Sequence, residues 1–227
     1  DFASADGEGY IVLPPQVLHA GNYGVPEMRE RVIFIGIRKD ALKPEALEAL
    51  SSNQVPHKYD PYPTPTHSAT VKGSHLLGIV TTQDVLEGLK EPENSIDASQ
   101  QLYSKAKLLA TGQGQTEIKL DNLAPTIRSE HHGNIEFRRL SLEHGGKHFD
   151  ELNAGLQERR LTPRECALIQ TFPPDYRFVM KNTSGRGYRL SSSGAYKVIG
   201  NAVPPVLAFN IAMRLQDVWD EYFVPTD

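Results

Sequence analysis

Two arginines at strand spacing are the first side chains in this sequence that could do chemistry. Arg29 and Arg31 lie in the run Glu27–Arg31, immediately before an apolar stretch. Residues two apart in a strand point to the same face, so the two guanidinium groups could bind one anionic or carbonyl-bearing ligand together. Solvated charges at the edge of a sheet are the alternative, and the residues alone leave both interpretations open.

A second cluster of polar side chains lies between residues 126 and 139. Arginine, histidine and asparagine side chains read base edges and contact phosphates in DNA complexes. A surface loop without a ligand is the alternative. Adjacent histidines rarely converge on one metal ion, and no further ligands have suitable spacing, so we expect no metal site. The candidates for DNA contact are Arg128, His131, His132, Asn134, Arg138 and Arg139.

A third feature is the run Gly200–Pro205, which forms a turn leading into a helix. The first turn of a helix has free backbone N–H groups, and these can bind a carboxylate or a phosphate. Most junctions of this kind bind nothing. The run is therefore a candidate ligand site only if other residues support it.

The elements that must position these groups can be predicted from apolar runs and turn residues. Runs rich in Val and Ile predict neighbouring strands at 10–18 and 31–38, followed by a helix within 39–50. Several prolines then exclude regular structure. A short helix is expected at 82–89, and the many glycines of 101–155 indicate a small, loop-rich module with short strands in TEIKL, APTIR and IEFRRL.

The strongest local signal is a helix that begins at Pro163. Thr162 is a good N-cap, proline suits the first helical position, and Glu165 completes a capping box. This helix should run for about two turns, because two prolines follow. We expect residues 181–195 to be a flexible polar connection, and a last helix from about 204 to 222 to be largely buried against a sheet.

Composition and charge limit the class of protein. The chain has 227 residues, of which 39% are hydrophobic and 23% charged, as in ordinary globular proteins. No apolar run approaches the ~20 residues that span a bilayer, so no membrane partner is expected. The net charge is −4, but residues 101–200 contain 15 Lys and Arg against 10 Asp and Glu, which is compatible with a surface that faces phosphates. The single cysteine, Cys166, is predicted to be an inert core thiol in a reducing compartment.

Four segments together resemble the cytosine-5 DNA methyltransferases. RRLTPRECALIQTFPPDYRF and SGAYKVIGNAVPPVLAFNIAMRL are similar to the family's motifs IX and X. GYIVLPPQVLHAGNYGVPEMRERVIFIGIR resembles motif VIII, whose core is Gln-x-Arg-x-Arg, with Glu27 in place of the glutamine. The pair Thr126-Ile127 matches the Thr-Ile pair of the family's target recognition domain. The resemblance covers nearly the whole chain except the interior of residues 40 to 120.

This resemblance implies an α/β fold. Residues 1–40 would be edge strands of a Rossmann-like methyltransferase sheet, and 41–194 a small, loop-rich, β-containing target recognition domain that includes motif IX. Residues 195–227 would return to the catalytic domain as the motif X helix. The expected location is the bacterial cytoplasm, in association with the nucleoid.

The resemblance also implies roles for the candidate residues. Arg31, with Arg29, would contact the flipped cytosine or a nearby phosphate. Asn201 and Ala202 would border S-adenosylmethionine, the methyl donor. Thr126, together with the basic cluster that follows it, would face double-stranded DNA.

Three parts of the family's machinery have no match in this sequence. It contains no Pro-Cys pair for the nucleophile, no Glu-Asn-Val for the cytosine-binding glutamate, and no Phe-x-Gly-x-Gly for the cofactor. We therefore expect an N-terminal catalytic half as partner, either covalently linked or as a separate subunit. The start at Asp1 rather than methionine favours a fragment. The isolated chain should be inactive, and the alternative is a non-catalytic DNA-binding or regulatory module.

Overall fold

The computed structural model describes residues 9–69, 75–109, 115–129, 135–224, and its longest feature is a bent two-stranded ribbon. Strand β2 (Gln16–His19) pairs antiparallel with β3 (Glu30–Ile33), and β1 (Tyr10–Val12) pairs antiparallel with β4 (Gly36–Arg38). The predicted neighbouring strands are confirmed, each interrupted near its middle. All named strand pairs in the described residues are antiparallel and two-stranded, so the chain is a mixed α/β structure with small sheets.

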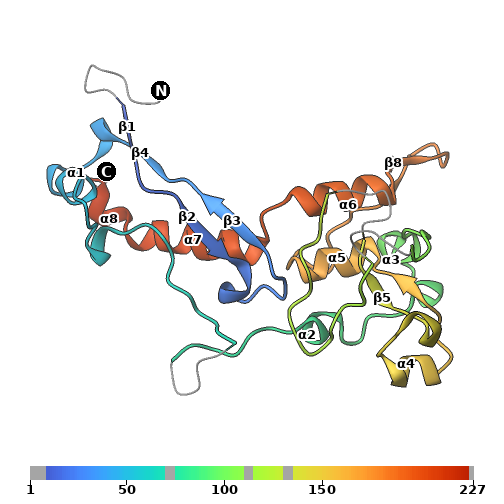
Figure 1. Cartoon of the computed structure of the whole chain (residues 1–227). Coiled ribbons are helices and arrows are strands. Elements are labelled where there is room, and N and C mark those ends of the chain that lie inside the picture. Colours follow the sequence, from blue (N-terminus) through green and yellow to red (C-terminus); the bar gives the residue numbers. More distant parts are fainter. Residues whose placement is uncertain (1–8, 70–74, 110–114, 130–134, 225–227) are drawn as a thin grey trace.

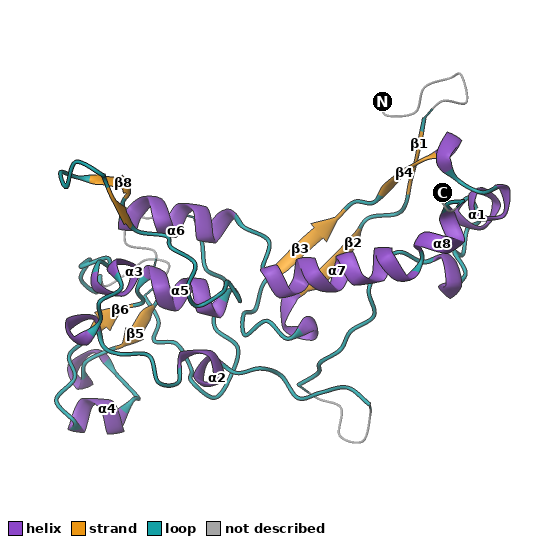
Figure 2. Ribbon diagram, turned by 180° about the vertical axis from the view of Figure 1, so that it is seen from behind, coloured by secondary structure: helices purple, strands orange, loops and turns teal. Residues whose placement is uncertain are grey.

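Helix α7 (Pro205–Asp217) runs along one face of this ribbon, as Figures 1 and 2 show. Its Leu207 joins Leu18 and Val25 in one buried cluster. Farther along, Tyr222 of α8 (Trp219–Tyr222) packs with α1 (Pro44–Leu50) in a second cluster. We call this assembly of β1–β4, α1, α7 and α8 the first lobe.

The expectation that the last helix would be largely buried is wrong. It is divided into α7 and α8, and Leu207 is the one buried residue of α7. Phe209 and Met213 are 61% and 41% exposed. The physical reason is that, within the described residues, α7 has the ribbon on one side and nothing on the other.

The second lobe surrounds α5 (Pro163–Ile169), which begins as predicted. The Thr162 side chain accepts a hydrogen bond from the Glu165 N–H, and the Glu165 carboxylate accepts one from the Thr162 N–H. Helix α5 packs against three other helices of the lobe. The second lobe also contains α2 (Thr82–Leu86), α3 (Ala98–Gln101), β5 (Phe137–Arg139), α4 (Phe149–Asn153) and β6 (Arg159–Arg160).

Short 3-10 helices complete the described chain. They are η1 (Ala20–Tyr23), η2 (Lys39–Ala41), η3 (His57–Tyr59), η4 (Pro92–Asn94) and η5 (Leu142–His144). Of the strands expected within 101–155, only Phe137–Arg139 is one. TEIKL and APTIR each contribute a single isolated bridge instead, to Phe137 and to Glu27 respectively.

The prediction of a flexible connection over 181–195 is wrong. Strand β7 (Met180–Lys181) pairs with β8 (Tyr188–Leu190), and α6 (Ser192–Asn201) follows at once. Ser191 caps α6 by accepting a hydrogen bond from the Gly194 N–H. Tyr196 and Ile199 are buried in the core of the second lobe. This tertiary packing outweighs the weak helix propensity of the serine-rich start of α6.

The buried residues of the two lobes show how the chain runs between them. Leu50 and Tyr62 lie in the core of the first lobe, whereas Tyr196 and Ile199 lie in that of the second. The chain therefore passes from the first lobe to the second and returns through Ala202 to Pro204.

The stretch Ser192–Asp217 is apolar and long enough, by length and composition alone, to cross a bilayer. Its backbone is not one continuous helix, because it breaks between Asn201 and Pro205. The two pieces have 10 and 13 residues and are about 15 and 20 Å long, both shorter than the ~30 Å hydrocarbon layer. Each packs on a different core of the protein.

Buried ion pairs connect the segments of the second lobe. Glu91 accepts hydrogen bonds from Arg139 at 2.5 Å and from Arg159 at 2.9 Å. Arg159 also pairs with Glu165 at 2.7 Å, and Arg139 with Glu151 at 2.5 Å. Burial opposes ionisation of Glu91, but the two arginines outweigh it and lower its pKa to about 2.

We expect Glu91→Gln to destabilise the chain by about 3 kcal/mol, because it leaves buried arginine charge without its full complement of carboxylates. The measurement is urea unfolding at neutral pH. Glu93→Gln, an exposed neighbour, is the matched control and should change the free energy of unfolding by less than about 0.5 kcal/mol. Equal effects of the two substitutions would contradict this role of Glu91.

Candidate functional site

One fully buried guanidinium joins three distant segments of the chain. Arg29 donates from Nη1 to the carbonyl of Ile127 at 2.8 Å. Its Nη2 donates to the carbonyls of Gly200 at 2.5 Å and Ala202 at 2.8 Å. The side chain is 0% exposed. We call Glu27, Arg29, Ile127, Gly200 and Ala202 the junction, because they connect the ribbon, the second lobe and the turn between α6 and α7.

Glu27 forms the other half of the junction. Its Oε1 accepts the backbone N–H of Ile127 at 2.6 Å and lies 3.4 Å from Arg29 Nη1. The backbone adds two further bonds, because Met28 donates to the carbonyl of Ala124 and the Ala124 N–H donates to Pro26. The segment around Ala124 therefore lies like an added strand against the start of β3.

Thr126 is tied to the same place by its side chain. Its Oγ1 donates to the carbonyl of Met28. The hydroxyl proton is thus used within the chain, while the residue itself remains half-buried. Three hydrogen bonds hold the Thr126-Ile127 pair against residues 27–29: one from the Thr126 hydroxyl, one from the Ile127 N–H and one to the Ile127 carbonyl.

Gly200 is required by the closeness of these segments. A Cβ atom at this position would lie 2.3 Å from the carbonyl carbon of Arg128 and 2.3 Å from the Ser129 nitrogen. Any side chain would push α6 away from the backbone of residues 128–129. The C-terminal end of α6 is therefore in van der Waals contact with the segment predicted to face DNA.

The electrostatics of the junction are unusual. Burial raises the pKa of Glu27 to about 8, against the lowering effects of the Ile127 N–H and the charge of Arg31. Glu27 Oε2 and Arg29 Nε are buried without a hydrogen-bond partner among the described residues. A carboxyl group in this setting stays protonated at neutral pH.

Arg29 and Arg31, which strand alternation places on one face, differ in burial. Arg29 precedes β3, which begins at Glu30, and turns into the protein. Arg31 lies within β3, is half-buried, and donates to the carbonyl of Glu30. Of the pair, Arg31 is the one a ligand can reach.

The predicted DNA contacts fall into three groups. Thr126 and Arg128 are half-buried beside the junction. His131, His132 and Asn134 lie outside the described residues. Arg138 and Arg139 belong to the ion-pair network, and Arg139 is 1% exposed with its nitrogens bonded to Glu91, Glu151 and the Gln157 carbonyl. That placement does not fit the expected contact of Arg139 with a phosphate.

The predicted cofactor residues lie at the end of α6. Asn201 is its last residue and is exposed, whereas the carbonyl of Ala202 points inward to Arg29. Cys166 is 0% exposed, and burial raises the pKa of its thiol, so it is a core residue as predicted. Within the described part of the chain, no group of three or more His, Cys, Asp or Glu side chains could hold a metal ion.

Sequence reasoning missed the role of Glu27 and of the carbonyl groups it accompanies. The one available signal was that an acidic residue replaces the glutamine of the motif that the segment resembles. Its partners could not be inferred, because Ile127 lies 100 residues away along the chain.

Comparisons with known proteins agree on one family. Residues 3–217 match C-5 cytosine-specific DNA methylase. The chain is 30% identical over 215 residues to the type II methyltransferase M.BsuRI of Bacillus subtilis, covering 93% of this chain and 43% of that protein. It is 26% identical over 235 residues to M.NgoFVII of Neisseria gonorrhoeae, covering 96% and 53%. The chain thus spans about half the length of the curated relatives it matches.

Among solved structures, the chain is similar to a prophage protein of E. coli classed as a DNA modification methyltransferase. The TM-score is 0.49 and the sequence identity 17%. The match covers 95% of this chain and 62% of that one.

The junction predicts a dependence of stability on pH. The folded chain keeps the Glu27 proton up to about pH 8, whereas the unfolded chain releases it near 4.5. Because the folded state binds more protons in this window, the free energy of unfolding should fall as pH rises from about 5 to 8. The expected slope is up to about 1.4 kcal/mol per pH unit.

Glu27→Gln tests this directly, since the amide keeps the Oε1 acceptor but does not titrate. Chemical unfolding of both chains between pH 5 and 9 is the measurement, with Glu48→Gln, at an exposed position of α1, as control. The curve of Glu27→Gln should be flatter than that of the unaltered chain. Parallel curves for the two would contradict a protonated Glu27.

Proposed function

Because the chain belongs to the C-5 cytosine-specific DNA methylase family, we propose that it is the C-terminal part of a DNA (cytosine-5)-methyltransferase. It would recognise a specific duplex sequence and help to position the flipped cytosine and the cofactor. The observation that supports this best is the junction, in which Arg29 ties the Thr126-Ile127 segment to the turn after α6. Because one side chain holds both the recognition segment and the turn on the cofactor side, it would fix the position of the DNA relative to the cofactor.

Arg31 is the residue we assign to the reacting base. It lies within β3, next to the junction and accessible to a ligand. A guanidinium there can donate to the carbonyl oxygen of an extruded cytosine or to the adjacent phosphate. The described contacts of Arg29 are all within the chain, so we assign it to positioning rather than to the base.

S-adenosylmethionine is the methyl donor of this family, and the turn after α6 fits one edge of its site. The side chain of Asn201 is exposed and has no hydrogen-bond partner among the described residues, so its amide is available to a ligand. Ala202 is fixed by Arg29 and would hold the turn in place. When bound, the cofactor would supply the methyl group, and most of its site would lie in the N-terminal half.

The DNA face would comprise Thr126 and Arg128, with His131, His132 and Asn134. Arg128 is the best candidate for reading a base, because it follows the Thr-Ile pair and its backbone lies against α6. Double-stranded DNA is the partner that this basic segment fits. The expected location, bacterial cytoplasm near the nucleoid, is part of the same proposal.

The ribbon has a second apolar face that supports an N-terminal catalytic half as partner. Leu18 and Ile35 point to α7 and are buried, whereas their neighbours along the strands point away from it. A sheet that is apolar on both faces is typical of the interior of an α/β domain. The exposed side chains of this open face are Tyr10, Val12, Val17, Val32 and Phe34.

This open face favours the enzyme over the non-catalytic module. Val17 and Val32 are 58% and 53% exposed and lie opposite each other in the ribbon, and Phe34 is 68% exposed. A contiguous exposed apolar surface marks an interaction site. A self-sufficient DNA-binding module would have no need of it.

We expect the chain alone to transfer no methyl group from labelled S-adenosylmethionine to DNA, and transfer to appear when an N-terminal half from a relative is supplied. Phe34→Ser should weaken this complementation without lowering the stability of the isolated chain. Phe149→Ser, at another exposed phenylalanine, in α4, is the control. Robust transfer by the chain alone would contradict the proposed function.

Arg31→Ala should lower the single-turnover rate of the complemented enzyme by about 100-fold, as expected for a lost donor to the reacting group. Its effect on DNA affinity should be much smaller. Arg31→Lys should recover little, because it lacks the planar fork. Arg38→Ala, an exposed arginine of the same ribbon that pairs with Asp40, is the control. A single-turnover rate within twofold of that of the unaltered enzyme would show that Arg31 is a surface charge without a role at the reacting base.

A further inference from the structure

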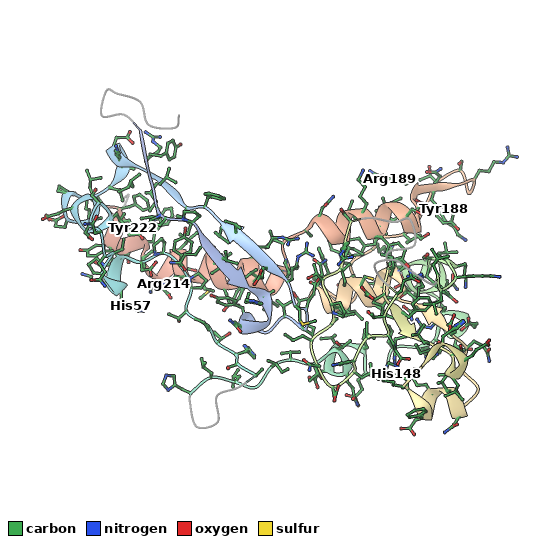
Figure 3. The ribbon with its side chains drawn as sticks, viewed as in Figure 1. His57, His148, Tyr188, Arg189, Arg214 and Tyr222 are labelled. Carbon is green, nitrogen blue, oxygen red and sulfur yellow. The ribbon has the colours of Figure 1, made fainter. Side chains whose placement is uncertain are left out.

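A short two-stranded arm leaves the second lobe just before α6. Strands β7 and β8 form it, and Gly185 and Gly187, both with positive φ, make its turn. Every residue from 181 to 189 is exposed. Figure 3 shows the arm extending away from the body of the protein, with Tyr188 and Arg189 labelled on it. The arm buries little, so its sequence is not required by a hydrophobic core.

The charge of this region has one sign. From residue 176 to residue 216 the sequence contains six Lys and Arg and no Asp or Glu, in a chain whose net charge is −4. Lys181, Arg186 and Arg189 lie in the arm itself. No carboxylate of the described residues forms an ion pair with any of the three. Exposed cations that form no ion pair with a carboxylate attract polyanions, above all nucleic-acid phosphates.

Helix α6 fixes the distance between the arm and the predicted DNA face. Its 10 residues make it about 15 Å long. The arm joins its N-terminal end through Ser191, and its C-terminal end touches the backbone of Arg128 and Ser129. Since one turn of duplex DNA is about 34 Å, the arm lies within about half a turn of the recognition segment.

We propose that the β7–β8 arm is a second DNA contact, which binds backbone phosphates of the duplex flanking the site engaged by the Thr126–Asn134 segment. This inference rests on the proposed function, because it takes duplex DNA as the ligand. Lys181, Arg186 and Arg189 would contribute charge rather than base recognition. The arm would therefore add affinity for every duplex alike and leave the choice of sequence to the segment beside the junction.

The test measures the affinity of the full chain for a duplex of about three helical turns over a series of salt concentrations. The double variant Arg186→Gln/Arg189→Gln should reduce the slope of log affinity against log salt by about two, one for each lost phosphate contact. Arg186→Lys/Arg189→Lys should retain the slope, because it keeps the charge. Lys90→Gln/Lys119→Gln removes two exposed charges elsewhere on the second lobe and should leave the slope unchanged. Thermal unfolding checks that all variants fold.

The outcomes separate the arm from the proposed function. If the unaltered chain and the Arg186→Gln/Arg189→Gln variant bind the duplex with the same slope of log affinity against log salt, the arm contact is wrong. The proposed function would be unaffected by that result. An equal loss of slope in the Lys90→Gln/Lys119→Gln control would also overturn it, since the effect would then be one of net charge. Absence of any salt-dependent duplex binding by the unaltered chain would count against DNA recognition itself.

Discussion

The buried guanidinium of Arg29 determines how the rest of this structure is arranged. A charge removed from water must be compensated, and here three backbone carbonyls and one carboxyl group do so. Two of those carbonyls, of Ile127 and Gly200, lie 98 and 171 residues away along the chain. The Arg29 guanidinium is therefore paired only when the second lobe and the turn after α6 are in place. The same contacts explain why residue 200 must be glycine, since only then can α6 approach residues 128–129 closely enough.

Local signals in the sequence were sufficient wherever a few neighbouring residues decide the structure. The helix at Pro163 could be predicted because Thr162 and Glu165 cap it within one turn. The ribbon could be predicted because both of its segments are apolar runs rich in Val and Ile, with turn residues between them. Helix α6 could not, since its serines and glycine are poor helix formers and its stability depends on Tyr196 and Ile199 reaching a distant core.

The candidate site also could not be predicted from local sequence signals alone. Strand alternation put Arg29 and Arg31 on one face, but it could not show that Arg29 is fully buried against backbone carbonyls whereas Arg31 is only half-buried. Arg138 and Arg139 had the right chemistry for DNA, yet carboxylates up to 48 residues away, such as Glu91, take up their charge. A residue type indicates what a side chain can bind. The partner that it binds in the folded protein depends on how distant segments pack together. The residue pattern of a single segment carries no information about that packing.

Glu27 makes the junction of this chain different from the motif it resembles. A protonated carboxyl group has one acceptor oxygen and one O–H donor, so it can replace a glutamine amide that accepts the Ile127 N–H through its oxygen. Because burial keeps the pKa of Glu27 near 8, the substitution preserves hydrogen bonding at neutral pH without adding a full buried negative charge. Above that pH the same oxygen becomes part of a buried ion pair with Arg29, 3.4 Å away, and Oε2 is then an anionic oxygen without a donor among the described residues. The junction therefore tolerates glutamate by keeping it protonated, and its geometry is tied to the protonation of one side chain.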